Sequence, residues 1–187
     1  MLIGLSGYAG TGKDEVARVL VGERGFVRAA VSDPLRRLLY AIDPAICAEV
    51  GGDLRHVSQL AGAWSYEEIK GIGDGRSFMQ RLGRALRQEF GEDVLINHVL
   101  NQDPGANRVS SSIRYPNEAL AVRKRGGFIV RVDRPGVGPA NGDVSETALD
   151  DYDFDARIIN GGDLVDLRLA TLAMFEHLHS QLGVLPL

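Results

Sequence analysis

A glycine-rich stretch near the N-terminus carries the residues whose types and spacing best suit chemistry. Gly7, Gly10 and Gly12 precede Lys13 with the spacing G-x-x-x-x-G-K, which is typical of a phosphate-binding loop. In such a loop, backbone N–H groups surround an anion and the lysine reaches the β- and γ-phosphates. The stretch therefore predicts a site for a nucleoside triphosphate. The expected contacts to ATP come from Gly7, Ala9, Gly10, Thr11, Gly12, Lys13 and Asp14.

The residues on either side of this loop have the pattern that such a loop requires. Residues 1–5 form a short apolar run typical of a buried parallel strand. Residues 15–20 open a helix, whose N-terminus would add partial positive charge to the site. A dinucleotide-binding loop would need the spacing G-x-G-x-x-G, which is absent here. An ordinary tight turn is disfavoured by the strand before the loop and the helix after it.

Asp14 departs from the usual form of the motif. Serine or threonine normally offers a hydroxyl to Mg²⁺ at this position, whereas this chain has a carboxylate. A carboxylate can bind Mg²⁺ directly or hold a metal-bound water. We therefore expect Asp14 to be a metal ligand. The alternative is that it only acts as a first-turn charge that favours the helix dipole.

Length and composition are those of a single α/β domain. The 187 residues are enough for one full core, and a net charge of −4 argues against a surface that coats nucleic acid. Apolar runs stay well short of the roughly 18 residues that span a bilayer. The chain opens directly on the first strand, so we expect no leader peptide. A single cysteine excludes an internal disulfide. These features favour a cytoplasmic protein, monomeric or homodimeric, without a membrane or nucleic-acid partner.

Strand and helix patterns alternate along the chain, which predicts a parallel sheet of about five strands with helices on both faces. The expected strands are residues 1–5, 26–31, 108–113, 128–132 and 158–159. The expected helices begin near residues 15, 32, 54, 77, 93, 119, 145 and 163, and Ser77 and Asp163 are expected to cap two of them. Residues 43–75 are interrupted by glycine and proline. We predict a single domain over residues 1–187, with an insertion around residues 43–75 that covers an acceptor site.

A second strand-to-helix junction lies at residues 31–36. Ser32 is an N-cap candidate followed by Pro34 in the first turn. Ligands of open parallel sheets bind outside the carboxyl ends of the strands, so Asp33 and Arg36 are expected near the same edge as the loop. The alternative is a simple helix cap with solvated arginines.

The helix expected from Ser77 to Phe90 has two faces. Its apolar stripe, which we assign to the core, consists of Phe78, Leu82, Leu86 and Phe90. Arg84 and Arg87, three residues apart, could both bind one phosphate, and Gln80 lies on the same face. A solvated polar face is the alternative.

Several separate segments, in one order along the chain, resemble those of the bacteriophage deoxynucleoside monophosphate kinases, a branch of the P-loop kinases. The resemblance runs from Met1 to about Leu167. It implies a three-layer α/β sandwich, with ATP and Mg²⁺ used to transfer the γ-phosphoryl group to a nucleoside 5′-monophosphate. The segments that carry it are residues 7–14, 32–36, Gln80 with Gly83 and Arg87, 113–118, 134–136, 145–146 and 155–161.

The resemblance also implies roles for individual residues. Lys13, Arg114 and Arg134 would neutralise phosphate charge during transfer, and Asp14 and Ser112 would hold the metal. The implied acceptor-binding residues are Asp33, Arg36, Gln80, Arg84, Arg87, Tyr115 and Glu146.

Two positions depart from the family pattern. The family usually has aspartate at Ser112 and histidine at Asp143, so a carboxylate is missing where Mg²⁺ is commonly held. Two other functions remain open. One is a different small-molecule P-loop kinase, since animal-type phosphomevalonate kinases also follow the lysine with aspartate. The other is a nucleotide-binding protein without catalysis.

Overall fold

The computed structural model describes residues 1–47, 52–61, 68–69, 74–102, 105–140 and 144–183. The chain forms two compact units, of which unit 1 consists of residues 1–30 and 96–187 and unit 2 of residues 31–95. Three parts of the predicted insertion, residues 48–51, 62–67 and 70–73, lie outside the described residues, as does Asp143. The assignment of the whole chain to one domain with a covering insertion therefore stays a prediction.

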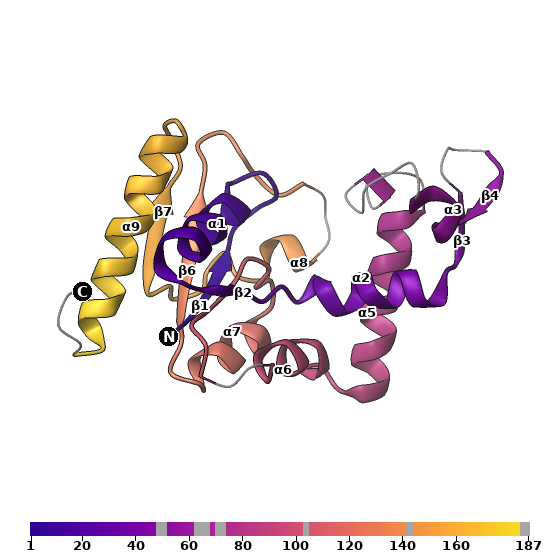
Figure 1. Cartoon of the computed structure of the whole chain (residues 1–187), viewed down its shortest axis with the longest axis horizontal. Helices are drawn as coiled ribbons and strands as arrows, with labels where there is room; N and C mark the ends of the chain where they lie inside the picture. The colour runs from indigo at the N-terminus through magenta and orange to yellow at the C-terminus, as the bar shows by residue number, and fades with distance from the viewer. Residues whose placement is uncertain (48–51, 62–67, 70–73, 103–104, 141–143, 184–187) are drawn as a thin grey trace. The chain divides into compact units, whose positions relative to one another are not determined.

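Unit 1 contains a five-stranded sheet in the order β2-β5-β1-β6-β7 (Figure 1). All of its strand pairs are parallel, which confirms the predicted sheet. Central β1 pairs with β5 on one side and β6 on the other, so that Gly4 lies between Ser110 and Ile129. The strands are β1 Leu2–Ser6, β2 Val27–Arg28, β5 Arg108–Ser110, β6 Phe128–Asp133 and β7 Ala156–Ile159.

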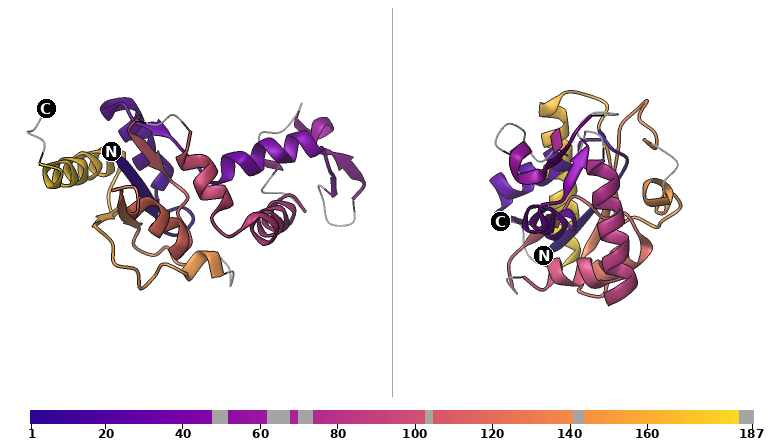
Figure 2. Two further views of the ribbon diagram at one scale, coloured as in Figure 1. Left: turned by 90° about the horizontal axis from the view of Figure 1, so that it is seen from below. Right: turned by 90° about the vertical axis from the view of Figure 1, so that its right-hand side faces the viewer.

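Helices cover both faces of this sheet. On one face α1 (Lys13–Arg24) and α9 (Leu164–Gln181) share a core with the strands. In this core the rings of Phe26 and Phe175 pack edge to face, with their centroids 5.9 Å apart. Helix α9 runs alongside β7 (Figures 1 and 2). On the other face α7 (Pro116–Arg123) packs on β1 and β6. The remaining helices that involve unit 1 are α6 Val94–Leu100 and α8 Val144–Thr147.

The predicted start of α9 is confirmed in detail. Asp163 is its N-cap, and its carboxylate accepts hydrogen bonds from the backbone N–H groups of Val165 at 2.8 Å and Asp166 at 3.0 Å. These bonds satisfy backbone donors that have no partner inside the helix. Helices α2 and α5 begin differently from the prediction, because Ser32 and Ser77 lie inside them and are not their caps.

Unit 2 has a small core of its own, built on α2 (Ser32–Ile42) and α5 (Gly75–Phe90). In the sequence, α2 is followed by two antiparallel strands, β3 (Ala45–Cys47) and β4 (Leu54–His56), and then by α3 (Val57–Ala61), before α5 begins. The prediction of a helix from residue 54 is therefore wrong for residues 54–56, which form β4, and the helix begins at Val57. The buried residues of this core are Leu39, Ile46, Val57, Leu60, Ile69 and Met79.

The apolar face of α5 is shifted from the predicted stripe. Met79 and Gly83 are buried, whereas Phe90 is 67% exposed. A Cβ atom on Gly83 would lie 3.4 Å from the Leu35 side chain of α2. The face of α5 that is buried therefore includes a glycine, which the spacing of large apolar residues does not reveal. Among the described residues, none of the helices is long and apolar enough to cross a membrane.

Candidate functional site

The loop between β1 and α1 has the conformation that its glycines predict. Gly7 and Gly12 have φ angles of 143° and 102°, a region that favours glycine. A Cβ atom on Gly7 would lie 2.2 Å from the carbonyl oxygen of Val132, and one on Gly12 would lie 2.7 Å from Asn160 Nδ2. These two glycines are therefore required by the close approach of β6 and of the turn after β7.

The carbonyl oxygen of Tyr8 is the centre of the loop's internal hydrogen bonds. Lys13 Nζ donates to it at 2.6 Å and to the carbonyl of Gly7 at 2.7 Å, and the Thr11 hydroxyl donates to it at 3.0 Å. From outside the loop, buried Asn160 donates its side-chain N–H to the Thr11 carbonyl at 2.9 Å. Asn160 holds the loop in place, a role for which its position in a turn gave no signal in the sequence.

Three of the predicted residues, Asp14, Arg114 and Glu146, lie within electrostatic reach of Lys13. The pKa of the Lys13 ammonium is lowered from 10.5 to about 8, chiefly by burial, since removal from water disfavours the charged form. The Arg114 guanidinium contributes to this lowering, whereas the carboxylates of Asp14 and Glu146 act in the opposite direction. The Arg131 guanidinium also lowers this pKa, so two positive and two negative side chains act on the Lys13 ammonium.

We expect the affinity for ATP to fall as the pH rises through about 8, because Lys13 then loses the charge that attracts phosphate. Below that pH the ammonium is present, and above it a neutral amine replaces it. Calorimetric measurement of the ATP dissociation constant against pH checks this. Lys13→Arg is the matched control, since a guanidinium stays charged throughout and its profile should be flat. A wild-type profile that stays flat to about pH 10 would contradict the assignment.

Arg114 is fixed at both its backbone and its side chain. Its Nη1 donates to Glu146 at 2.9 Å, and the Glu146 side chain is only 5% exposed. Its backbone N–H, like that of Tyr115, donates to the carboxylate of Glu118, at 2.8 and 3.3 Å respectively. Glu118 is buried in the first turn of α7, where a carboxylate satisfies unpaired backbone donors. The structure thus brings Lys13, Arg114 and Glu146 together.

Asp14 contacts a serine that the sequence did not single out. Its Oδ1 accepts a hydrogen bond from Ser111 Oγ at 2.7 Å and pairs with Arg28 at 3.0 Å, while its side chain stays 76% exposed. Strand β5 ends at Ser110 and is shorter than the predicted strand 108–113, and Ser111 directly follows it. The predicted metal residue Ser112 is the next residue along the chain.

The donor set around Asp14 fits a magnesium ion that keeps several of its waters. In the described part of the chain, no group of three or more His, Cys, Asp and Glu side chains could hold a metal. Mg²⁺ in phosphotransfer sites commonly uses one or two carboxylates, with substrate phosphates and water as its other ligands. One exposed carboxylate with a neighbouring hydroxyl meets that requirement.

The other predicted residues lie in two places. Arg134 belongs to unit 1, where it directly follows β6, is exposed and accepts a backbone hydrogen bond from Val137 at 3.0 Å. The remaining acceptor candidates belong to unit 2, in which α2 contacts α5. Asp33 and Arg36 come from α2, and Gln80, Arg84 and Arg87 come from α5.

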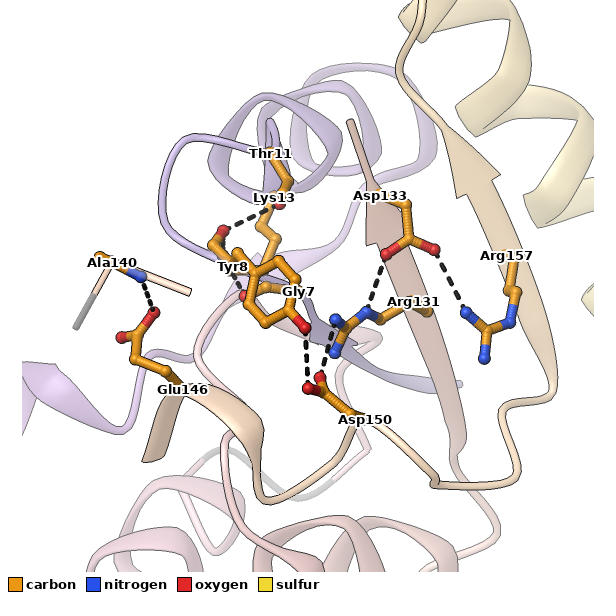
Figure 3. A network of polar contacts seen from close by, with 10 residues as sticks. All are labelled: Gly7, Tyr8, Thr11, Lys13, Arg131, Asp133, Ala140, Glu146, Asp150 and Arg157. Carbon is orange, nitrogen blue, oxygen red and sulfur yellow. Dashed lines mark hydrogen bonds and ion pairs between the residues drawn. The ribbon is translucent and has the colours of Figure 1, made fainter. Parts of the chain in front are cut away.

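A polar network joins the loop to β6 and to the segment after α8 (Figure 3). The Tyr8 hydroxyl donates to Asp150 Oδ2 at 2.7 Å, and Arg131 Nη2 donates to Asp150 Oδ1 at 3.1 Å. Arg131 also pairs with Asp133 at 2.9 Å, and Asp133 pairs with Arg157 at 3.2 Å. Tyr8 and Asp150 are 142 residues apart in sequence, so no local pattern predicts this contact.

The chain shows sequence similarity to one viral protein over most of its length. A protein of Acanthamoeba polyphaga mimivirus, provisionally named deoxynucleotide monophosphate kinase, is 26% identical over 171 residues, which cover 80% of this chain and 82% of the viral protein. No protein-family model matches the chain.

Solved structures of kinases share the fold. Shikimate kinase from Aquifex aeolicus matches with a TM-score of 0.51 at 14% identity, over 98% of this chain and 100% of its own. Shikimate kinase from Acinetobacter baumannii, in complex with shikimate, matches with a TM-score of 0.50 at 14% identity, over 96% of this chain and 93% of its own. At this identity the match concerns the fold and not the substrate. The chain therefore has the three-layer α/β fold of the P-loop kinases.

Proposed function

We propose that the protein is an ATP-dependent deoxynucleoside or nucleoside monophosphate kinase, which transfers the γ-phosphoryl group of ATP to a 5′-monophosphate. The observation that carries this proposal is the phosphate-binding loop, whose Lys13 lies in the electrostatic environment of Arg114, Asp14 and Glu146. The similarity of the chain to the mimivirus protein supports a nucleoside monophosphate as the acceptor. The resemblance of its sequence segments to the bacteriophage enzymes agrees with this choice. The proposed partners are ATP and one monophosphate, with a monomer or homodimer acting in the cytoplasm.

The arrangement suits phosphoryl transfer because that reaction depends on position and charge. The transferred group carries its charge on peripheral oxygens, and catalysis consists largely of holding the reactants in line and neutralising that charge. In the proposed mechanism Lys13 and the loop N–H groups hold the β- and γ-phosphates. Arg114, fixed by Glu118 and Glu146, and Arg134 neutralise the charge of the transferred group.

The acceptor-binding residues that the sequence predicts stay part of the proposal. Tyr115 and Glu146 come from unit 1, and the proposal adds five side chains of unit 2, with the stretch 43–75 as a cover. Arginine forks suit monophosphates because they bind phosphate oxygens bidentately. The five side chains are Asp33, Arg36, Gln80, Arg84 and Arg87.

A panel of acceptors with ATP tests the proposed function. Each common deoxy- and ribonucleoside monophosphate is incubated with ATP and Mg²⁺, and the products are separated by chromatography. The expected result is a diphosphate from at least one monophosphate. Turnover of phosphomevalonate alone would favour the other small-molecule kinase. Tight binding of ATP without turnover of any acceptor would favour a nucleotide-binding protein.

Arg36→Ala and Arg87→Ala are each expected to raise KM for the monophosphate more than KM for ATP. Each loses a charge-assisted contact worth about 1.5–3 kcal/mol. Steady-state kinetics with either substrate varied separates the two effects. If both variants weaken ATP alone, the donor and acceptor assignments are reversed. Unchanged kinetics in both would favour solvated arginines.

Asp14→Asn is expected to raise the Mg²⁺ concentration for half-maximal rate about tenfold. In the proposed site Asp14 holds Mg²⁺ with Ser112 nearby, and the metal supplies charge neutralisation to the phosphates when bound. Without metal, the affinity for ATP should stay equal or improve, because a negative charge near the phosphates is gone. Mg²⁺ titrations of the rate and metal-free ATP calorimetry measure the two effects.

Two further variants sharpen this test. Glu15→Gln is the matched control, since Glu15 lies in the same first turn but pairs with Arg18. Ser112→Asp in the Asp14→Asn background should restore part of the metal affinity. An unchanged Mg²⁺ titration for Asp14→Asn, with only a small drop in melting temperature, would leave Asp14 as a helix-dipole charge.

A further inference from the structure

Tyr8 is held in two directions at once. Inside the loop its carbonyl oxygen accepts from Lys13 Nζ and from the Thr11 hydroxyl. Its side chain points away from the loop, and its hydroxyl donates to Asp150 Oδ2 at 2.7 Å (Figure 3). The Arg131 guanidinium carbon lies 4.6 Å from the centroid of the Tyr8 ring. The position of the Tyr8 side chain therefore constrains the backbone atom that fixes Lys13.

Arg131 anchors this arrangement in the core of unit 1. It lies on β6 opposite Ser6, the last residue of β1 before the loop. Its side chain is only 6% exposed, and its charge is matched by Asp133 at 2.9 Å and Asp150 at 3.1 Å. Removing the partners of a buried guanidinium is costly, because its charge then stays unpaired. The carboxylate that receives the Tyr8 hydroxyl is therefore held in place by the sheet.

The hydroxyl of Tyr8 stays a donor over the ordinary pH range. Its hydrogen bond to the Asp150 carboxylate raises its pKa, and burial and the charge of Asp150 raise it further. A protonated phenol can donate to one carboxylate oxygen while Arg131 donates to the other. The raised pKa therefore favours the protonated phenol that this hydrogen bond requires.

We propose that Tyr8, Asp150 and Arg131 are positioning residues that hold the phosphate-binding loop ready for ATP. The linkage runs from the buried guanidinium through the carboxylate to the phenol, and from the Tyr8 carbonyl to Lys13. A loop that is already ordered binds its ligand more tightly, because less conformational entropy is lost on binding. The inference deepens the proposed kinase function by naming what orders its donor site, and it rests on that function only for its kinetic consequences.

Equilibrium binding of ATP to variants of the whole protein tests the proposal. Tyr8→Phe removes the hydroxyl and keeps the ring, and Asp150→Asn removes the charge and keeps the shape. Each is expected to weaken ATP binding about tenfold in calorimetry. Because both residues act through one hydrogen bond, the double variant should bind ATP no more weakly than the worse single variant.

Arg157→Gln is the matched control. It removes a partly exposed partner of Asp133 at the far end of the same network and leaves the bond between Tyr8 and Asp150 untouched. Its ATP affinity should stay within about twofold of wild type. If Asp150→Asn does not fold, Tyr8→Phe alone carries the comparison with this control, because the aromatic ring still covers Arg131.

Kinetics separate positioning from a purely structural role. Tyr8→Phe should raise KM for ATP while KM for the monophosphate stays near wild type. A variant that only melts earlier, with ATP binding within twofold of the control, would overturn the inference, as would fully additive losses in the double variant. Wild-type binding of ATP without phosphorylation of any acceptor would overturn the proposed function alone, since the calorimetric comparison would still decide the inference.

Discussion

Lys13→Ala is expected to lower kcat by roughly 10²-fold or more, through loss of charge stabilisation in the transition state. The fold should persist, because among the described residues Lys13 Nζ bonds to the carbonyls of Gly7 and Tyr8 and Thr11 still donates to the latter. Steady-state kinetics with a melting curve for each variant checks both statements.

Lys124→Ala is the matched control for that experiment, since Lys124 is exposed at the end of α7, outside the loop. Its kcat should match wild type. Near-normal activity in a correctly folded Lys13→Ala protein would remove the donor site from this loop. Equal losses in both lysine variants would point to a general effect of charge.

Gly7→Ala is expected to lower the free energy of unfolding by about 2–5 kcal/mol and to abolish measurable ATP binding. The added Cβ atom would lie 2.2 Å from the backbone oxygen of Val132, and backbone atoms cannot move aside as a flexible side chain can. Relief requires a shift of the loop or of the pairing between β1 and β6. Chemical denaturation and ATP calorimetry measure the two losses.

Gly10→Ala separates the steric overlap from backbone strain. Gly10 also has a positive φ, 80°, but no atom lies within 4 Å of its would-be Cβ atom. It should therefore lose only about 1–2 kcal/mol of stability. If both variants lose the same stability, the close approach of β6 to Gly7 has no energetic role.

The loop, the sheet and the cap of α9 could be predicted from sequence because each depends on neighbours in the chain. Glycine spacing, strand–helix alternation and the Asp163 cap are local signals. Tyr8 and Asp150 are 142 residues apart, and Thr11 and Asn160 are 149 apart. Contacts of that kind are set by how the strands pair, and residue types alone carry no trace of them.

Smaller errors also have physical causes. The third expected strand extended to residue 113, but β5 ends at Ser110, so Ser111 contacts Asp14 where the family pattern pointed to Ser112. The pair β3 and β4 has three residues in each strand, which is too short for an alternating pattern to be recognised. The roles predicted for Arg36 and Arg87 stay predictions.

Unit 2 is one uninterrupted stretch of chain with its own core of apolar side chains. A core drawn from so short a segment supplies only a few kcal/mol, whereas β1 and β6 lie in the centre of the larger sheet. Amide protons of unit 2 would therefore exchange with solvent through a partial opening that leaves unit 1 folded. The glycine-rich loop, its lysine and the tyrosine network all belong to unit 1, so the proposed nucleotide site would stay folded during each such opening.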